Sequence, residues 1–251
     1  MPDSSFTLLG SGRAAKHLRH YFHWLGISCQ SWGRTASGDG DSPLRGSLKS
    51  ATHVFLLVTD AAIEPLARRA QTIAAELDDT KRYWIHCSGS LATSLAWGCH
   101  PLMTFPADRL HSWETYQKMA WVIDAQAPAA DLLLPRMPNP KFRINPAQKA
   151  LYHALCVLSG NVTTLLWQRM IRGLEEQLGI PRSAALPYLN AISQSIEDQA
   201  ETALTGPLAR GDRDTLTRDL AALAGDPYAG LLAAAVKAYW GGGATAEGES
   251  P

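Results

Sequence analysis

The sequence predicts an α/β fold, in which a mostly parallel sheet is followed by an all-helical C-terminal domain. Short apolar runs alternate with helix-length segments over residues 1–145, which is the pattern of strands joined by crossover helices. Residues 53–58 read as one continuous apolar run, as expected for a strand that is buried on both faces of a parallel sheet. Over residues 146–240 the pattern is helical throughout. We therefore expect a larger domain over residues 1–145 and a helical domain over residues 146–240.

The first predicted strand, Phe6–Leu9, leads directly into the segment Gly-Ser-Gly-Arg-Ala-Ala at residues 10–15. Its spacing, GxGxxA, is that of a Rossmann-type dinucleotide-binding turn. Gly10 permits the tight turn, Gly12 lets the backbone approach a pyrophosphate, and Ala15 lets helix and strand pack closely. Free N–H groups at the start of the next helix favour anions. Such glycines also make ordinary turns, but a strand before them and a helix and strand after them are the context that the motif requires.

The second strand delivers a positive charge to the same edge of the sheet. After a helix over residues 13–25, a strand at residues 28–32 is followed by Arg34 and Thr35. Sites that prefer NAD carry an acidic residue about 20 residues beyond the glycines, whereas an Arg nearby accommodates the extra phosphate of NADP. The sequence has no carboxylate at that point, so it predicts NADP. The alternative is that Arg34 is only a solvated loop residue.

Two further strands place polar side chains at their carboxyl ends. The strand at residues 53–58 ends in Thr59 and Asp60, and the strand at Tyr83–His86 is followed by Ser88. Ligands of open parallel sheets bind outside the carboxyl ends of the strands, so these side chains are expected to converge with the glycine turn on one crevice. Ser88 could instead simply cap the next helix.

Four other segments complete the first domain. Residues 36–52 hold little apolar sequence and are predicted to form a shortened connection. A helix follows Asp60 as far as residue 77. Beyond the crevice, further strands are predicted at Ala120–Asp124 and Lys141–Ile144.

The helical domain begins with a strong start signal. Asn145 can cap the helix and Pro146 suits its first position, and the helical pattern then continues to Gly179 without a break, about 33 residues or about 50 Å. A helix of this length suggests the spine of a helical domain or a dimer interface, and we expect a homodimer through the helical domain. Further helices are predicted at residues 183–203, 214–223 and 226–240, followed by a disordered tail at residues 241–251.

Composition excludes several classes of function. Lys and Arg together number 23, as do Asp and Glu, so the chain has no general basic field to hold nucleic acid. No apolar run approaches the length of a membrane span, and the N-terminus lacks the layout of a signal peptide. Four scattered cysteines suggest reduced thiols in a cytoplasmic protein and no metal site. These are Cys29, Cys87, Cys99 and Cys156.

Five motifs together resemble one family. They are the glycine turn, the His-Cys-Ser-Gly turn at residues 86–89, His-Pro-Leu at 100–102 with Phe105, Tyr-His-Ala at 152–154 leading to Ser-Gly-Asn at 159–161, and the segment at 205–212. In this order they resemble Rossmann-like proteins that carry the domain of unknown function numbered 2520. That family is distantly similar to ketopantoate reductase, pyrroline-5-carboxylate reductase, and the 3-hydroxyisobutyrate and 6-phosphogluconate dehydrogenases. Its members are usually assigned as NADP oxidoreductases without a settled substrate.

The resemblance implies a role for each of several cofactor-binding residues. Those that would hold the pyrophosphate are Gly10, Ser11, Gly12, Arg13 and Ala14. Arg34 and Thr35 would bind the adenosine phosphate, and Thr59 with Asp60 the ribose on the nicotinamide side, with Ser88 as a further candidate. Asn161 would face the nicotinamide and the substrate. The related dehydrogenases place a catalytic Lys one turn before this Asn, where this chain has Val157.

The absence of that Lys leaves two histidines as candidates for moving a proton. His153 lies eight residues before Asn161, about two turns away on an α-helix, and His100 lies in the segment that leaves the ligand-binding edge of the sheet. Histidine titrates near neutral pH, so either could be a general acid, although both could also be structural. Arg210 is a candidate for binding an anionic group or joining two subunits, and Glu197 is a weaker site candidate.

We therefore expect a cytoplasmic, NADP-preferring oxidoreductase that transfers a hydride between nicotinamide and a small carbonyl, imine or alcohol substrate. The alternative is a sensor or regulatory protein that binds NADP without catalysis, which the missing Lys favours. A deazaflavin in place of nicotinamide is a third possibility that comes only from the way relatives are labelled.

Overall fold

The computed structural model describes residues 4–34, 40–78 and 80–241. Thr35 and the predicted tail from residue 242 lie outside these residues. The contacts within the chain divide it into two compact units, residues 1–160 and 161–251, and the division falls inside a long helix. The first unit contains the sheet and the second contains helices only, in the part of the chain that is described.

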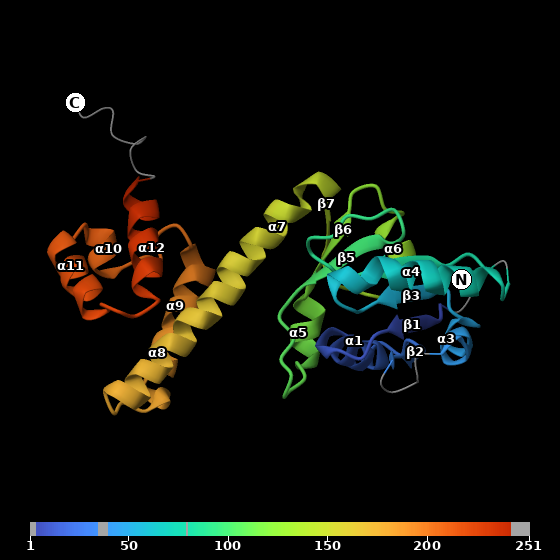
Figure 1. Cartoon of the computed structure of the whole chain (residues 1–251), viewed down its shortest axis with the longest axis horizontal. Helices are drawn as coiled ribbons and strands as arrows, with labels where there is room; N and C mark the ends of the chain where they lie inside the picture. The colour runs from blue at the N-terminus through green and yellow to red at the C-terminus, as the bar shows by residue number, and fades with distance from the viewer. Residues whose placement is uncertain (1–3, 35–39, 79, 242–251) are drawn as a thin grey trace. The chain divides into compact units, whose positions relative to one another are not determined.

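A seven-stranded sheet forms the centre of the first unit (Figure 1). Its strands lie in the order β2-β1-β3-β4-β5-β6-β7, and every neighbouring pair is parallel except β5 with β6. This confirms the predicted fold class. The strands are β1 (Phe6–Leu9), β2 (Cys29–Trp32), β3 (His53–Leu56), β4 (Tyr83–His86), β5 (Trp97–Leu102), β6 (Ala120–Asp124) and β7 (Lys141–Ile144).

Strand β5 is not predicted, because Gly98 and Pro101 interrupt its apolar pattern. Its pairing explains how the proline is tolerated. Strand β4 pairs with Trp97 and Gly98, whereas β6 pairs with Cys99–Leu102, so Pro101 has a neighbouring strand on one side only. The second half of β5 therefore extends past the carboxyl end of β4.

Helices cover both faces of the sheet and bury two separate cores. Phe6, Leu8 and Phe55 point to the face covered by α1, α5 and α6, whereas Leu9 and Val54 point to the face covered by α3 and α4. This alternation explains why the strands are apolar throughout. The helices are α1 (Arg13–Trp24), α3 (Asp41–Leu48), α4 (Asp60–Ala75), α5 (Trp113–Lys118) and α6 (Ala130–Leu133).

The predicted shortened connection over residues 36–52 is wrong in its second half. Helix α3 occupies Asp41–Leu48 and buries Leu44 and Leu48 completely against the α4 face. Two leucines one turn apart are enough to hold this short helix on the sheet, although the segment is rich in polar residues.

The long helix spans Pro146–Gln177 but is not uniformly α-helical. A 3₁₀ turn, η1 (Pro146–Gln148), leads into α7 (Lys149–Cys156), followed by a π-helical segment, η2 (Val157–Val162), and α8 (Thr163–Gln177). The predicted cap is confirmed, because the Asn145 side chain accepts a hydrogen bond from the Ala147 N–H at 3.0 Å. The prediction of an unbroken α-helix is wrong at the π segment, so α-helical spacing does not apply between His153 and Asn161.

This helix also exposes much apolar surface. By length and composition it is capable of crossing a membrane, with a mean hydropathy of 1.2 in its best 18-residue window and none of that window buried. The expectation that no apolar run approaches the length of a membrane span does not hold for this helix by length and composition. Exposed apolar surface of this kind is covered either by lipid or by another protein surface.

The second unit is a set of short helices. Asp212 caps α11, because its Oδ1 accepts a hydrogen bond from the Thr215 N–H at 3.0 Å. Gly206 and Pro207 begin a short helix before it. The elements are η3 (Arg182–Ala184), α9 (Leu186–Gln199), α10 (Gly206–Arg210), α11 (Arg213–Ala222) and α12 (Ala229–Gly241).

Candidate cofactor and active site

The glycine turn is held tightly against the neighbouring strands. Gly10 has φ +142°, and a Cβ added there would lie 2.2 Å from the Leu57 carbonyl oxygen, so only glycine fits. The Gly10 N–H donates to the Trp32 carbonyl at 2.7 Å, and a Cβ at Gly33 would lie 3.0 Å from the Ser11 Cβ. The turn is therefore wedged between the ends of β2 and β3.

The outer side of the same turn is open. Ser11, Gly12 and Arg13 are exposed, and nothing lies within 4 Å of a Cβ added at Gly12. Helix α1 begins there without a side-chain cap and without an acidic residue in its first turn. Its first N–H groups therefore have no partner within the helix and can bind an anion. Ala14 is half-buried behind them.

Arg34 follows β2 and is exposed, whereas Thr35 lies outside the described residues. Beside it, Trp32 is buried, and the Arg69 guanidinium lies 5.9 Å from the centre of the Trp32 ring while pairing with Asp41 at 2.8 Å. Arg34 is therefore exposed to solvent at the end of β2, next to the buried Trp32.

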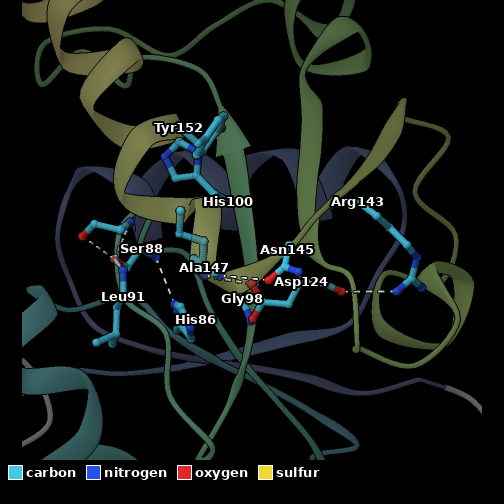
Figure 2. A network of polar contacts seen from close by, with 12 residues as sticks. His86, Ser88, Leu91, Gly98, His100, Asp124, Arg143, Asn145, Ala147 and Tyr152 are labelled. Carbon is cyan, nitrogen blue, oxygen red and sulfur yellow. Dashed lines mark hydrogen bonds and ion pairs between the residues drawn. The ribbon is translucent and has the colours of Figure 1, made fainter.

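A carboxylate and two hydroxyls meet at the ends of β3 and β4. Asp60, in the first turn of α4, accepts hydrogen bonds at Oδ2 from the Ser88 hydroxyl at 2.7 Å and the Ser90 hydroxyl at 2.8 Å. The Ser88 Oγ also accepts from the Leu91 N–H at 3.0 Å (Figure 2). Ser88 therefore stabilises a turn, and the alternative that it caps a helix is wrong, because the next described element is β5. Thr59 precedes Asp60 and is exposed.

Two predicted histidines lie together above the loop after β4. His100 Nδ1 is 2.7 Å from the Tyr152 hydroxyl of α7 (Figure 2). A Cβ added at Gly89 would lie 3.2 Å from His100 Nε2 and 2.7 Å from His153 Cδ2, so both rings pack against the Gly89 backbone. Burial, and to a smaller extent the nearby His153, lower the pKa of His100 to about 4, so its ring is neutral at physiological pH.

His86 lies beneath this loop and is fully buried. Its Nδ1 accepts from the Ser88 N–H at 3.3 Å, while its Nε2 has no hydrogen-bond partner among the described residues. Burial, with a smaller effect of Lys149, lowers the pKa of His86 to about 4. His86 is therefore a neutral ring that supports the Ser88 turn.

A buried ion pair attaches α7 to the sheet. Lys149 Nζ lies 3.0 Å from Asp124 Oδ1, and the Asp124 Oδ2 accepts from the Gly98 N–H at 2.7 Å. A Cβ at Gly98 would lie 2.2 Å from the lysine nitrogen, so glycine makes room for the pair. Four residues of this cluster were not predicted from the sequence, namely Lys149, Asp124, Ser90 and Tyr152. The available signal was an Asp ending a strand and a Lys in an apolar helix, both of which are unusual when unpaired.

The remaining predicted residues lie in the second unit. Asn161 is in the π segment and is exposed, although it lies in a long apolar helix. Arg210 ends α10 and is exposed, as is Glu197 on α9. The cluster described above is built from residues of the first unit alone.

Two hollows among the described residues lie away from this cluster. One, of about 330 Å³, is between α8 and the turn before α12, and the other, of about 290 Å³, is beside Trp84. Neither is lined by a predicted site residue. No group of three or more His, Cys, Asp or Glu side chains in the described part of the chain could hold a metal ion.

Comparisons place these features among known proteins. Residues 121–238 match the family described as Domain of unknown function (DUF2520). No curated protein sequence matches the chain.

Three solved structures share the fold at low sequence identity. A Bacteroides fragilis protein assigned as an NADP oxidoreductase is 18% identical with a TM-score of 0.74, over 94% of this chain and 98% of that one. A Thermotoga maritima protein is 18% identical with a TM-score of 0.65, over 96% and 98%. An imine reductase of Myxococcus stipitatus in complex with NADP⁺ is 14% identical with a TM-score of 0.61, over 97% and 96%.

Proposed function

We propose that the protein is an NADP-dependent oxidoreductase. The proposal rests on the DUF2520 domain that the chain carries at residues 121–238 and on the Rossmann-type sheet, whose strands lie before and within that domain. It transfers a hydride between the nicotinamide and a small carbonyl, imine or alcohol substrate. A structure of the same fold contains NADP⁺ in an imine reductase, which supports the class of cofactor and reaction.

The observation that carries this proposal is the open glycine turn. An exposed helix start with no side-chain cap, no acidic residue and no atom above Gly12 is a site for a pyrophosphate. Its binding residues are those of the turn, namely Gly10, Ser11, Gly12, Arg13 and Ala14. Arg34 is exposed at the neighbouring strand end, where it can pair with the 2′-phosphate.

The nicotinamide half of the cofactor binds at the next two strand ends in this proposal. Asp60 uses Oδ2 for Ser88 and Ser90, which leaves Oδ1 to accept hydrogen bonds from ribose hydroxyls. A carboxylate in the first turn of α4 disfavours a second phosphate there. When bound, the nicotinamide supplies or accepts the hydride, and His100 and His153 are the groups that lie near enough to assist proton movement.

Calorimetric titration with NADPH and NADH tests the cofactor proposal. We expect NADPH to bind at least 10-fold more tightly, which is about 1.4 kcal/mol. Arg34→Ala should remove this preference by weakening NADPH alone, while Arg68→Ala, an exposed arginine on α4, should change neither affinity. Equal affinity for both cofactors, or binding of neither, would refute the NADP proposal.

The second candidate is an NADP-binding sensor without catalytic activity. It is favoured by Val157, which stands where related dehydrogenases have a catalytic Lys. A panel of keto and imino compounds with NADPH, followed by the absorbance of the reduced cofactor, separates the two functions. Turnover that disappears in His100→Ala or His153→Ala supports the enzyme. Turnover that survives both changes but is lost in Asn161→Ala excludes these histidines as proton donors.

The assembly we propose is a homodimer in the cytoplasm. Among the described residues of the second unit, only Gly173, Ala185 and Leu216 are buried, so these helices have little core of their own. A second copy of the chain would cover the exposed leucines of the long helix. The four cysteines are all free, as expected in a reducing compartment. Arg210 is then available for an anionic substrate group or for the partner.

A further inference from the structure

We propose that Tyr152 is a positioning residue that holds His100 in the tautomer with the proton on Nε2, so that His100 presents a fixed N–H donor above Gly89. The inference rests on the proposed function, because the Nε2–H would donate a hydrogen bond to the carbonyl oxygen or imine nitrogen of the substrate that is reduced. It also assigns the two histidines different tasks.

The geometry of the pair supports the first step. The Tyr152 hydroxyl lies 2.7 Å from His100 Nδ1, and the two rings are nearly perpendicular, with 81° between their planes and 5.5 Å between their centres. A short hydrogen bond of this kind fixes the rotation of the imidazole ring and engages Nδ1. Tyr152 is therefore placed to select one of the two neutral tautomers of His100.

The direction of the hydrogen bond follows from the chemistry of the two groups. Burial, followed by the neighbouring Cys156, raises the pKa of Tyr152, so its phenol keeps the O–H and can donate it. The thiol of Cys156 is the other group beside the phenol, and sulfur is a weak acceptor, so the O–H is directed to the nitrogen lone pair of His100. A neutral His100 that accepts at Nδ1 must carry its proton on Nε2.

The location of Nε2 places this N–H where it can donate a hydrogen bond to a substrate. Nε2 packs against the Gly89 backbone, and Gly89 lies between Ser88 and Ser90, the two serines bound to Asp60. The N–H is thus close to the loop that we assign to the nicotinamide ribose. A neutral imidazole is a poor acid but a good hydrogen-bond donor, and a donor fixed in advance stabilises the negative charge that develops on a reduced carbonyl. His153 is then the histidine that supplies the proton.

Nitrogen NMR of the protein labelled with ¹⁵N-histidine tests the tautomer without any ligand. In the full-length protein at neutral pH, we expect His100, assigned by its loss in His100→Gln, to show a protonated Nε2 and an unprotonated Nδ1. Tyr152→Phe keeps the ring but removes the hydroxyl, and it should move the Nδ1 signal through loss of the hydrogen bond. Tyr188→Phe, at an exposed tyrosine of the second unit, should leave the His100 signals unchanged.

Two results would overturn the inference: a protonated Nδ1 in the unmodified protein, or His100 signals that are identical in Tyr152→Phe. The spectrum of the unmodified protein decides the tautomer even if the variant does not fold. In turnover assays, Tyr152→Phe should lower kcat at least about 10-fold and leave the KM for NADPH unchanged. Failure of the protein to bind NADPH would instead refute the proposed function and leave the tautomer standing.

Discussion

At the scale of single residues, the glycine turn combines two opposite requirements within three positions. Gly10 has no room for a side chain, because the Leu57 carbonyl occupies the space and φ is +142°. Gly12 has open space in the same direction that a side chain would take, and its φ of −74° is available to any residue. Gly10 is therefore required by the fold, whereas no contact within the fold requires glycine at Gly12, the position that we assign to the pyrophosphate.

This contrast predicts different outcomes for two alanine substitutions. Gly10→Ala should destabilise the protein by at least about 2 kcal/mol, because a Cβ meets backbone and φ is unfavourable. Gly12→Ala should cost less than about 1 kcal/mol but weaken NADPH binding. Urea unfolding measures the first effect and calorimetry the second. Equal losses of stability in the two variants would contradict this account of the turn.

The buried histidines predict how stability depends on pH. Burial lowers the pKa of His86 and His100 to about 4, while an unfolded histidine titrates near pH 6.5. Between these values the unfolded chain binds protons that the native state does not, so stability is full above pH 6.5 and falls as the pH drops towards 4. The loss is roughly 3 kcal/mol for each histidine.

His100→Gln tests this dependence, because it removes one of the two groups. In urea unfolding followed from pH 6.5 to pH 4, the variant should lose stability less steeply than the unmodified protein. His17 and His53, whose pKa values burial also lowers, are present in both proteins and cancel in the comparison. A slope that does not change would show that His100 does not resist protonation in the native state.

At the scale of elements, helix α7 has the reverse of the usual amphipathic pattern. Its inward stripe is polar and is spaced as one helical face, whereas its outward residues Leu151 and Leu155 are 64% and 54% exposed. The inward stripe consists of Lys149, Tyr152, His153 and Cys156. This arrangement supports two of our proposals, that the inner face of α7 lines the active site and that its outer face binds a second copy of the chain.

The ion pair at the start of α7 predicts a strongly coupled pair of substitutions. Lys149→Met leaves the Asp124 carboxylate buried with the Gly98 N–H as its remaining partner, and it should cost about 3–5 kcal/mol. Adding Asp124→Asn removes the unpaired charge and keeps an acceptor for Gly98, so the double variant should recover much of that loss. A double-mutant cycle in urea measures the coupling.

An exposed ion pair provides the control for this cycle. Arg182 and Glu175 form one in the second unit, and Arg182→Met should change stability little. Additive effects of Lys149→Met and Asp124→Asn would mean that the two side chains do not act as a pair.

At the scale of the whole molecule, the exposed leucines of the long helix predict self-association. Sedimentation should show a dimer, and Leu151→Lys with Leu155→Lys should shift it towards monomer, because charges would have to be buried in the interface. Flotation with phosphatidylcholine vesicles tests the other way of covering this helix. A monomer that binds vesicles would refute the dimer proposal in favour of a membrane surface.

Local chemistry was sufficient to predict much of this protein. Buried strands are apolar, helices begin at residues such as Asn145 and Asp212, and a turn between strand and helix needs glycine at Gly10; each of these requirements is visible within a few residues. The order of strand and helix then follows from the pattern. The sheet of the first unit and the position of the glycine turn were predicted for this reason.

The rest depends on residues that are distant in the sequence. Strand β5 is recognisable only from its neighbours, because Pro101 is acceptable at a position that β4 does not reach. Lys149 is paired with a residue 25 positions earlier, and Tyr152 with His100, 52 positions earlier. Their partners are set by the order in which strands join the sheet, and burial then gives these contacts their strength. Spacing along the chain therefore identified the glycine turn, whereas only the packed structure decided which polar side chains meet beside it.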